Sequence, residues 1–174
     1  MKKIVLLHII IVFISSCKSP DTILLKDLSF TNSIFSGIKT DSLHTYCLLA
    51  SGYFRAPSSK NSDSLITQWI LQHPNAKVVS VATHGPTMTD YPDSKMTYCW
   101  LIDKKDTINN FLIKNGCYPG GTMTLSTFKE LADNQILHIT KKEYENFIQQ
   151  IITAEEFARL NKLGIWAKQN DEEE

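Results

Sequence analysis

The hydrophobic pattern begins with an apolar run at the N-terminus. Lys2 and Lys3 precede a stretch from Ile4 to Ile14 in which His8 is the only polar side chain. As a helix the run would measure about 16 Å, whereas the hydrocarbon core of a bilayer is about 30 Å thick. The pattern therefore predicts a secretory signal peptide rather than a membrane span.

The signal is followed by Ile14, Ser15, Ser16 and Cys17. An aliphatic residue, two small residues and a cysteine resemble the lipobox of bacterial lipoproteins, where a peptidase cuts before the cysteine and its thiol carries diacylglycerol. We therefore expect residues 1–16 to be the signal peptide, Cys17 to be lipidated and residues 17–22 to form a short tether. The protein would be a lipoprotein of the bacterial cell envelope, on the inner or the outer membrane. The alternative is an ordinary signal peptide with an incidental cysteine.

The following pattern predicts one domain over residues 23–168 and an acidic tail over 169–174. Apolar and β-branched runs indicate strands, and apolar residues at helical spacing indicate helices. The predicted strands are 42–50, 76–83 and 96–103, and the predicted helices are 62–72, 107–115 and 141–163. We expect Gly116 and Gly164 to end the second and third of these helices. The last helix has an apolar stripe made of Tyr144, Phe147, Ile148, Ile151, Ile152, Ala158 and Leu160.

Two other stretches are predicted to be irregular. Residues 84–95 form a polar connection between two strands, and residues 118–140 form an insertion with one helical turn near 125–132. A tight turn over residues 103–106 closes the strand that precedes the second helix.

Composition argues weakly against nonspecific nucleic-acid binding. Removing residues 1–16 takes away Lys2 and Lys3, which leaves 16 basic against 18 acidic side chains in the mature chain. Such binding depends mainly on the neutralisation of phosphates. Arginine, the usual bidentate phosphate ligand, occurs only as Arg55 and Arg159.

Three cysteines remain after lipidation, namely Cys47, Cys99 and Cys117. An exported protein can form disulfides, but an odd number allows one internal pair at most. The sequence leaves open which two would pair, and three buried free thiols are an equal alternative.

The order and spacing of the later elements resemble the staphylococcal-nuclease-like (thermonuclease) family. Ile108 to Gly116 reads INNFLIKNG, and Ala154 to Trp166 reads AEEFARLNKLGIW; both are similar to helical motifs of that family. The resemblance covers roughly residues 62–166. It implies an α+β protein, an OB-fold-like five-stranded barrel with about three helices, with Trp166 folded back onto the barrel.

The same resemblance implies a catalytic set that this chain does not carry. Nucleases of the family hold Ca²⁺ with carboxylates and contact the phosphate with two arginines. Here Tyr46 or Cys47 stands where the first arginine is expected, and no carboxylate lies between Asp41 and Asp63. Asp41 is the candidate for one metal ligand, and Lys95 occupies roughly the place of the second arginine. We expect no cofactor, with Ca²⁺ required only if the chain is a nuclease after all.

A few further residues are candidates for a site. Arg55 with Tyr53 and Phe54 forms a candidate ligand-binding set. His84 is a candidate acid–base group or metal ligand, and Arg55 and Lys95 are the other catalytic candidates. Each has a structural alternative. Arg55 could form a surface ion pair, Tyr53 and Phe54 could pack at the edge of the core, and His84 could donate a hydrogen bond that orders its loop. His44 and His138 show no zinc spacing.

Three functions are compatible with this pattern. The first is a membrane-anchored binding module on a nuclease-like domain that has lost catalysis. The second is an altered nuclease that hydrolyses phosphodiesters through Arg55, Lys95 and His84. The third is an envelope partner or immunity protein. The predicted partners are the lipid bilayer, through Cys17, and an unknown ligand or envelope protein.

Overall fold

The computed structural model describes residues 23–30, 35–38, 41–48, 58–120 and 128–168. A six-stranded sheet forms the centre of the domain, with strands in the order β1-β2-β4-β3-β6 and β5 paired to β4. The strands are β1 (Phe35–Ile38), β2 (Asp41–Leu48), β3 (Lys77–His84), β4 (Lys95–Asp103), β5 (Asp106–Thr107) and β6 (Ile136–Leu137).

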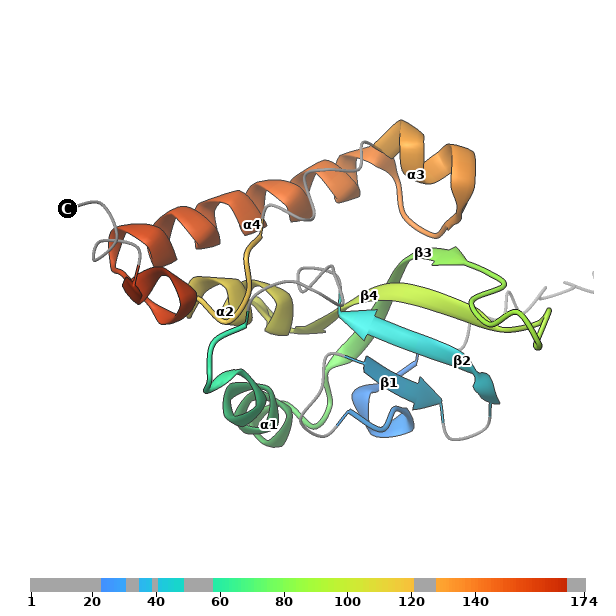
Figure 1. The fold of residues 1–174 in the computed structure, drawn as a ribbon, viewed down its shortest axis with the longest axis horizontal. Helices are drawn as coiled ribbons and strands as arrows, with labels where there is room; N and C mark the ends of the chain where they lie inside the picture. Colours follow the sequence, from blue (N-terminus) through green and yellow to red (C-terminus); the bar gives the residue numbers. More distant parts are fainter. Residues whose placement is uncertain (1–22, 31–34, 39–40, 49–57, 121–127, 169–174) are drawn as a thin grey trace, which may run out of the picture.

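Helices lie on both sides of this sheet (Figure 1). The 20-residue helix α4 (Lys141–Leu160) runs along one side, whereas α1 (Ser62–Gln72) lies on the other. The remaining helices are α2 (Ile108–Lys114), α3 (Phe128–Asn134) and the short 3-10 turns η1 (Leu25–Asp27) and η3 (Gly164–Lys168). None of the described helices is long and apolar enough to cross a bilayer.

The α+β class is confirmed, but the expected five-stranded barrel is not what the described residues form. Strands β2 and β4 are parallel, whereas β3 pairs antiparallel with β4 and β6. Strands β1 and β6 are the two ends of the path and do not pair with each other, so the sheet is open. The parallel β2–β4 pair requires a crossover, and β3 reaches the far edge of β4 within that connection.

Aromatic stacking attaches α4 to the sheet. Trp100 of β4 is fully buried, and its ring lies 4.3 Å from that of Phe147, nearly parallel to it. Tyr144, Ile151 and Ala158 of the predicted stripe are buried, but Leu160 is 84% exposed, so its assignment to the stripe was wrong. Successive helical residues are about 100° apart around the axis. Leu160 comes two residues after Ala158, so it points away from the face on which Ala158 packs.

The side-chain amide of Asn109 completes the hydrogen bonding of β4. Strand β2 pairs with β4 as far as Leu48 opposite Cys99, and β5 begins to pair at Ile102. Between these two points Asn109 donates from Nδ2 to the carbonyl of Cys99 (3.1 Å) and accepts from the amide of Leu101 (3.2 Å). The side chain is fully buried. It therefore substitutes for a strand residue where neither β2 nor β5 reaches.

Two glycines let the ends of α2 and α4 meet backbone to backbone. Gly116 and Gly164 have φ of 64° and 55°, in the left-handed region that favours glycine. A Cβ on either one would lie 2.1 Å from a carbonyl oxygen of the other turn, that of Leu163 or of Gly116. The amide of Ile165 donates to the Gly116 carbonyl at 2.9 Å. Gly116 ends α2 as predicted, whereas α4 ends at Leu160, before Gly164.

Other predicted elements are confirmed with small shifts. The helix at 62–72, the strands at 76–83 and 96–103 and the turn at 103–106 correspond to α1, β3, β4 and the β4–β5 turn. The insertion at 118–140 contains α3 and also β6, which the sequence did not reveal because a two-residue strand has no alternation to detect. No disulfide joins Cys47, Cys99 and Cys117 to one another, and all three are buried.

We expect Asn109→Ala to lower the free energy of unfolding by about 2–3 kcal/mol, because two buried backbone groups of β4 would lose their partner. Asn110→Ala, on the more exposed next position of the same helix, is the matched control. Urea unfolding followed by circular dichroism measures both. Equal stability of the two variants would show that the Asn109 amide does not complete the edge of β4.

Candidate functional site

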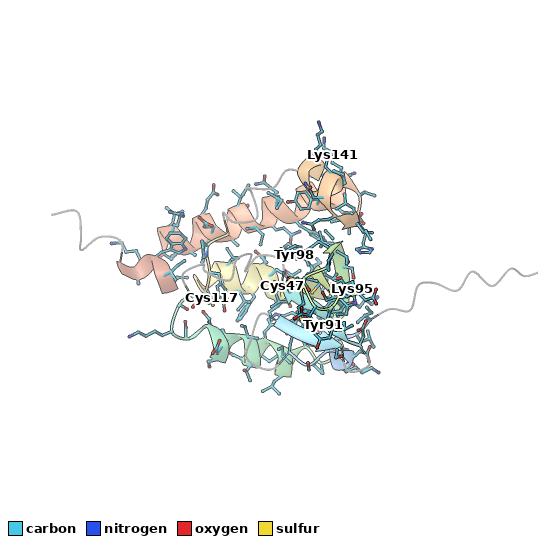
Figure 2. All side chains as sticks on the ribbon, turned by 45° about the vertical axis from the view of Figure 1, so that its right-hand side comes forward. Cys47, Tyr91, Lys95, Tyr98, Cys117 and Lys141 are labelled. Carbon is cyan, nitrogen blue, oxygen red and sulfur yellow. The ribbon has the colours of Figure 1, made fainter. Side chains whose placement is uncertain are left out.

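A groove lies at the end of the sheet where β3 stops and β4 starts. Its volume is about 460 Å³, and it separates the β3–β4 connection from the corner between α3 and β6. We call it the Lys95 groove and define it by the polar side chains on its wall, which are Thr83, His84, Asp93, Ser94, Lys95, Asp133, Asn134 and Gln135. Figure 1 shows that the β3–β4 connection and α3 lie at the same end of the molecule, and Figure 2 shows Lys95 there beside Tyr91, far from Cys117.

The wall formed by the β3–β4 connection is held by Ser94. Its hydroxyl is buried and accepts hydrogen bonds from the backbone amides of Thr87 (2.9 Å) and Met88 (2.8 Å). A β-bridge joins Met88 to Tyr91. The predicted polar connection is therefore an ordered turn, which fixes Asp93 and Lys95 relative to the strand ends.

The charges of the Lys95 groove are mixed. Lys95 is exposed at the start of β4, and Asp93 and Asp133 face the same groove from the connection and from α3. Thr83 and Gln135 add a hydroxyl and an amide. A lone cation among two carboxylates is a poor site for a polyanion, whose binding depends on clusters of Lys and Arg.

Two polar atoms of the wall residues are buried without a hydrogen-bond partner among the described residues. They are Nε2 of His84 and Oε1 of Gln135. The His84 ring stacks on Tyr98 with centroids 5.6 Å apart, and burial lowers the pKa of His84 from its usual 6.5. His84 is therefore predominantly neutral at neutral pH. A buried polar group without a partner costs about 1–3 kcal/mol.

A line of four side chains crosses the sheet next to the groove. His44 Nε2 lies 2.6 Å from Thr97 Oγ1, which lies 2.6 Å from Thr83 Oγ1, which lies 2.8 Å from His138 Nε2. These residues come from β2, β4 and β3, and His138 follows β6, where its backbone amide donates to Val81. Thr83 belongs both to this line and to the wall of the Lys95 groove.

The number of protons in this line is constrained. Three contacts of 2.6–2.8 Å each need a hydrogen between the two heavy atoms. The two hydroxyls of Thr83 and Thr97 supply one hydrogen each. At least one of His44 and His138 therefore carries a proton on Nε2.

The pKa of His44, at one end of the line, is shifted from its usual value. Burial lowers its pKa, and the positive charge of Lys95, its cross-strand neighbour, lowers it further. Asp41, three residues earlier on β2, acts in the opposite direction and raises the pKa of His44. His44 is predominantly neutral at neutral pH, as is His84.

A second groove, of about 540 Å³, lies between α2 and α4. Its polar side chains are mostly amides, and they are Asn110, Asn146, Gln149 and Gln150. Its charged side chain Lys114 lies over the Phe157 ring, 4.7 Å from the centroid. The Lys95 groove, with its histidines and carboxylates, offers more varied chemistry and is the better candidate.

The structure brings together some of the residues singled out from the sequence. His84 and Lys95 face the same groove, and Asp41 is near His44 at that end of β2. The carboxylate of Asp41 accepts from the backbone amide of Leu43 at 3.0 Å. Arg55, with Tyr53 and Phe54, lies outside the described residues, as does Cys17.

Sequence reasoning missed Thr83, Thr97 and Asp133, and it gave His44 and His138 no role. The two histidines are far apart in the chain, and only the strand register brings them to one line of hydrogen bonds. Alternation could have placed Thr83 and Thr97 on strand faces, but no pattern in the sequence pairs them.

In the described part of the chain, no three His, Cys, Asp or Glu side chains come close enough together to hold an ion. A comparison with known protein families finds no match, and no curated protein is significantly similar to the chain.

We expect the free energy of unfolding to fall as the pH is lowered from about 7.5 to about 5.5. The pKa values of His44 and His84 are lowered in the folded state, so the unfolded chain binds more protons once the pH falls through about 6.5. Their contribution to stability is complete above that pH and declines towards the lowered pKa values. Urea unfolding across this pH range measures the slope.

The contribution of His44 can be separated. His44→Gln keeps a side-chain amide near Thr97 but removes the titrating group, so the slope should become shallower. A slope that is the same in the variant and in the unmodified protein would contradict the assignment.

Proposed function

We propose that this protein is an exported lipoprotein, anchored through Cys17, whose folded domain binds a small polar ligand in the Lys95 groove. The observation that carries the ligand-binding part is the groove itself, whose wall holds one cation, two carboxylates, the His84 ring and the Gln135 amide. Its volume of about 460 Å³ is in the usual range for small-molecule sites.

Lipid anchoring is supported by the N-terminal sequence. Lys2 and Lys3, an apolar run that is short for a membrane span, and Ser15-Ser16-Cys17 form the order of a lipoprotein signal. A single acyl chain gives only marginal, reversible binding, but mature lipoproteins usually carry two or three chains. Attachment through Cys17 would therefore be durable.

The chemistry of the groove favours a ligand that carries both charges or none. Lys95 suits a carboxylate or a carbonyl, whereas Asp93 and Asp133 suit an ammonium, an amide or hydroxyl groups. A soluble peptidoglycan fragment has all these groups, with sugar hydroxyls, acetamides and a short peptide bearing an amine and carboxylates. We propose this class of compound as the ligand.

We further propose that the domain is a degenerate member of the staphylococcal-nuclease-like family. The motif residues now have structural reasons that support this: Asn109 completes the edge of β4, and Gly116 and Gly164 allow two helix ends to meet. Loss of catalysis is supported by the sequence between Asp41 and Asp63, which has no carboxylate for a Ca²⁺ ion.

The altered nuclease is the second candidate, because His84 and Lys95 do face one groove. Asp93 and Asp133 on the same wall would repel a phosphate. Cleavage of DNA or RNA by the purified protein, lost in Lys95→Gln, would favour this candidate over a binding module.

Cys17→Ala should release the protein from the membrane. In a bacterial host, the unmodified chain is expected to sediment with membranes and to incorporate a labelled fatty acid. Cys47→Ala is the matched control and should do both. Incorporation of label by Cys17→Ala, or its absence from the unmodified chain, would contradict the anchor.

Lys95→Gln should weaken the binding of a disaccharide–peptide fragment of peptidoglycan about tenfold, the usual effect of losing one hydrogen bond to a charged group. Isothermal titration of the mature protein in detergent measures this. Lys114→Gln makes the same change in the α2–α4 groove and should leave the affinity unchanged. Lack of binding by the unmodified protein, or a loss confined to Lys114→Gln, would refute the assignment.

A further inference from the structure

The described chain begins at the end of the sheet opposite the Lys95 groove. Leu24 forms a β-bridge with Lys77, the amide of Leu25 donates to the carbonyl of Ala76, and the amide of Val78 donates to the carbonyl of Ile23. The chain therefore enters the domain at the start of β3. The groove lies at the other end of β3, roughly 23 Å away at the usual rise of a strand.

Four lysines gather at this entry end, and we call it the lysine end. Lys77 opens β3 and pairs with Ile102 of β4, which leads to Lys104 and Lys105 in the β4–β5 turn. Lys26 lies in η1, the turn whose first residue, Leu25, is hydrogen-bonded to Ala76. All four side chains are exposed. The carboxylates at this end are Asp27, Asp103 and Asp106. Asp27 accepts from the amide of Leu24, and Asp103 pairs with His73 at 3.0 Å.

An exposed leucine belongs to the same end. The bond between His73 and Asp103 places the C-terminus of α1 next to the β4–β5 turn. Leu71, in the last turn of α1, is 75% exposed. Protein surfaces that lie against lipid headgroups typically combine lysines with exposed apolar side chains.

The β4–β5 turn keeps a lysine where a glycine would be easier. Lys104 has a φ of 57°, a conformation that Gly or Asn adopts at lower cost in two-residue hairpin turns. A residue that retains a strained conformation is a reason to look for a function of its side chain. Here the side chain extends the positive charge of the lysine end.

We propose that the lysine end is the membrane-facing surface of the domain, contacting anionic lipid headgroups while the Lys95 groove points away from the bilayer. This rests on the proposed anchor at Cys17. Five residues lie between Cys17 and Ile23, and these two positions can be at most about 20 Å apart, so the bilayer lies within reach of this end. The wall of the groove, with Asp93 and Asp133 around Lys95, has the wrong charge for anionic headgroups.

Hydrogen exchange of the full lipidated protein tests the orientation. The protein is reconstituted in vesicles of phosphatidylcholine with phosphatidylglycerol and in vesicles of phosphatidylcholine alone. Residues 24–27, 71–77 and 103–106 should exchange more slowly on the anionic vesicles, and residues 85–95 should not change. High salt should remove the difference, because the contacts are screened.

Charge variants separate this surface from others. Each lysine that contacts anionic headgroups strengthens the binding of the domain surface to the bilayer about fivefold. The double substitution Lys104→Gln with Lys105→Gln should therefore abolish most of the protection from hydrogen exchange. Lys141→Gln with Lys142→Gln removes the same charge from the N-terminus of α4 and should have no effect. Lys104→Gly relieves the backbone strain, so it should raise the melting temperature of the protein. It should nevertheless reduce the protection on anionic vesicles, because the positive charge is lost. If Lys104 served only the structure of the turn, this substitution would leave the protection unchanged.

The outcomes distinguish the orientation from the anchor. A protein that does not stay with either kind of vesicle refutes the anchor. A protein that stays attached but shows protection at residues 85–95, or equal protection on both kinds of vesicle, refutes the orientation alone.

Discussion

The organisation of this domain depends on the hydrogen bonding of β4. One edge of the strand is paired with β3 along most of its length, and the other edge is shared between β2, the Asn109 amide and β5. Because buried backbone groups must be paired, the short β2 is tolerated only with Asn109 in place. Trp100 of the same strand then stacks on Phe147 and attaches α4. The two ends of β4 are thereby held on a rigid element, as a binding site requires.

The antiparallel ladder of β3 and β4 places two different chemistries at its two ends. At one end His84 and Lys95 line the groove side by side on paired strands, next to the line from His44 to His138. At the other end Lys77 lies near the β4–β5 turn and the point where the chain enters the domain. In our proposal the lysine end faces the membrane, and the Lys95 groove remains open to a ligand because it lies at the other end of the ladder.

Local patterns were sufficient for most of the longer elements but not for β6 or for the site. The apolar spacing of α1 and the β-branched run of β3 predicted these two elements from the sequence. Gly116 predicted the end of α2, since glycine favours the positive φ that this position has. Leu160 was misassigned because the buried face of α4 is set by its packing and not by apolarity alone. The open sheet was not foreseen, because strand pairing is a long-range property and the family resemblance suggested a barrel. Thr83 and Thr97 had no signal in the sequence, since their importance arises from cross-strand contacts with two distant histidines.

The central claim is that the two ends of the β3–β4 ladder lie at different distances from the membrane. Paramagnetic relaxation of the backbone amides along β3 tests it most directly, with the lipidated protein on anionic nanodiscs that contain a lipid carrying a gadolinium chelate. The account predicts that relaxation is strongest at Lys77 and falls steadily towards His84. A uniform profile, or one that rises towards His84, would contradict it.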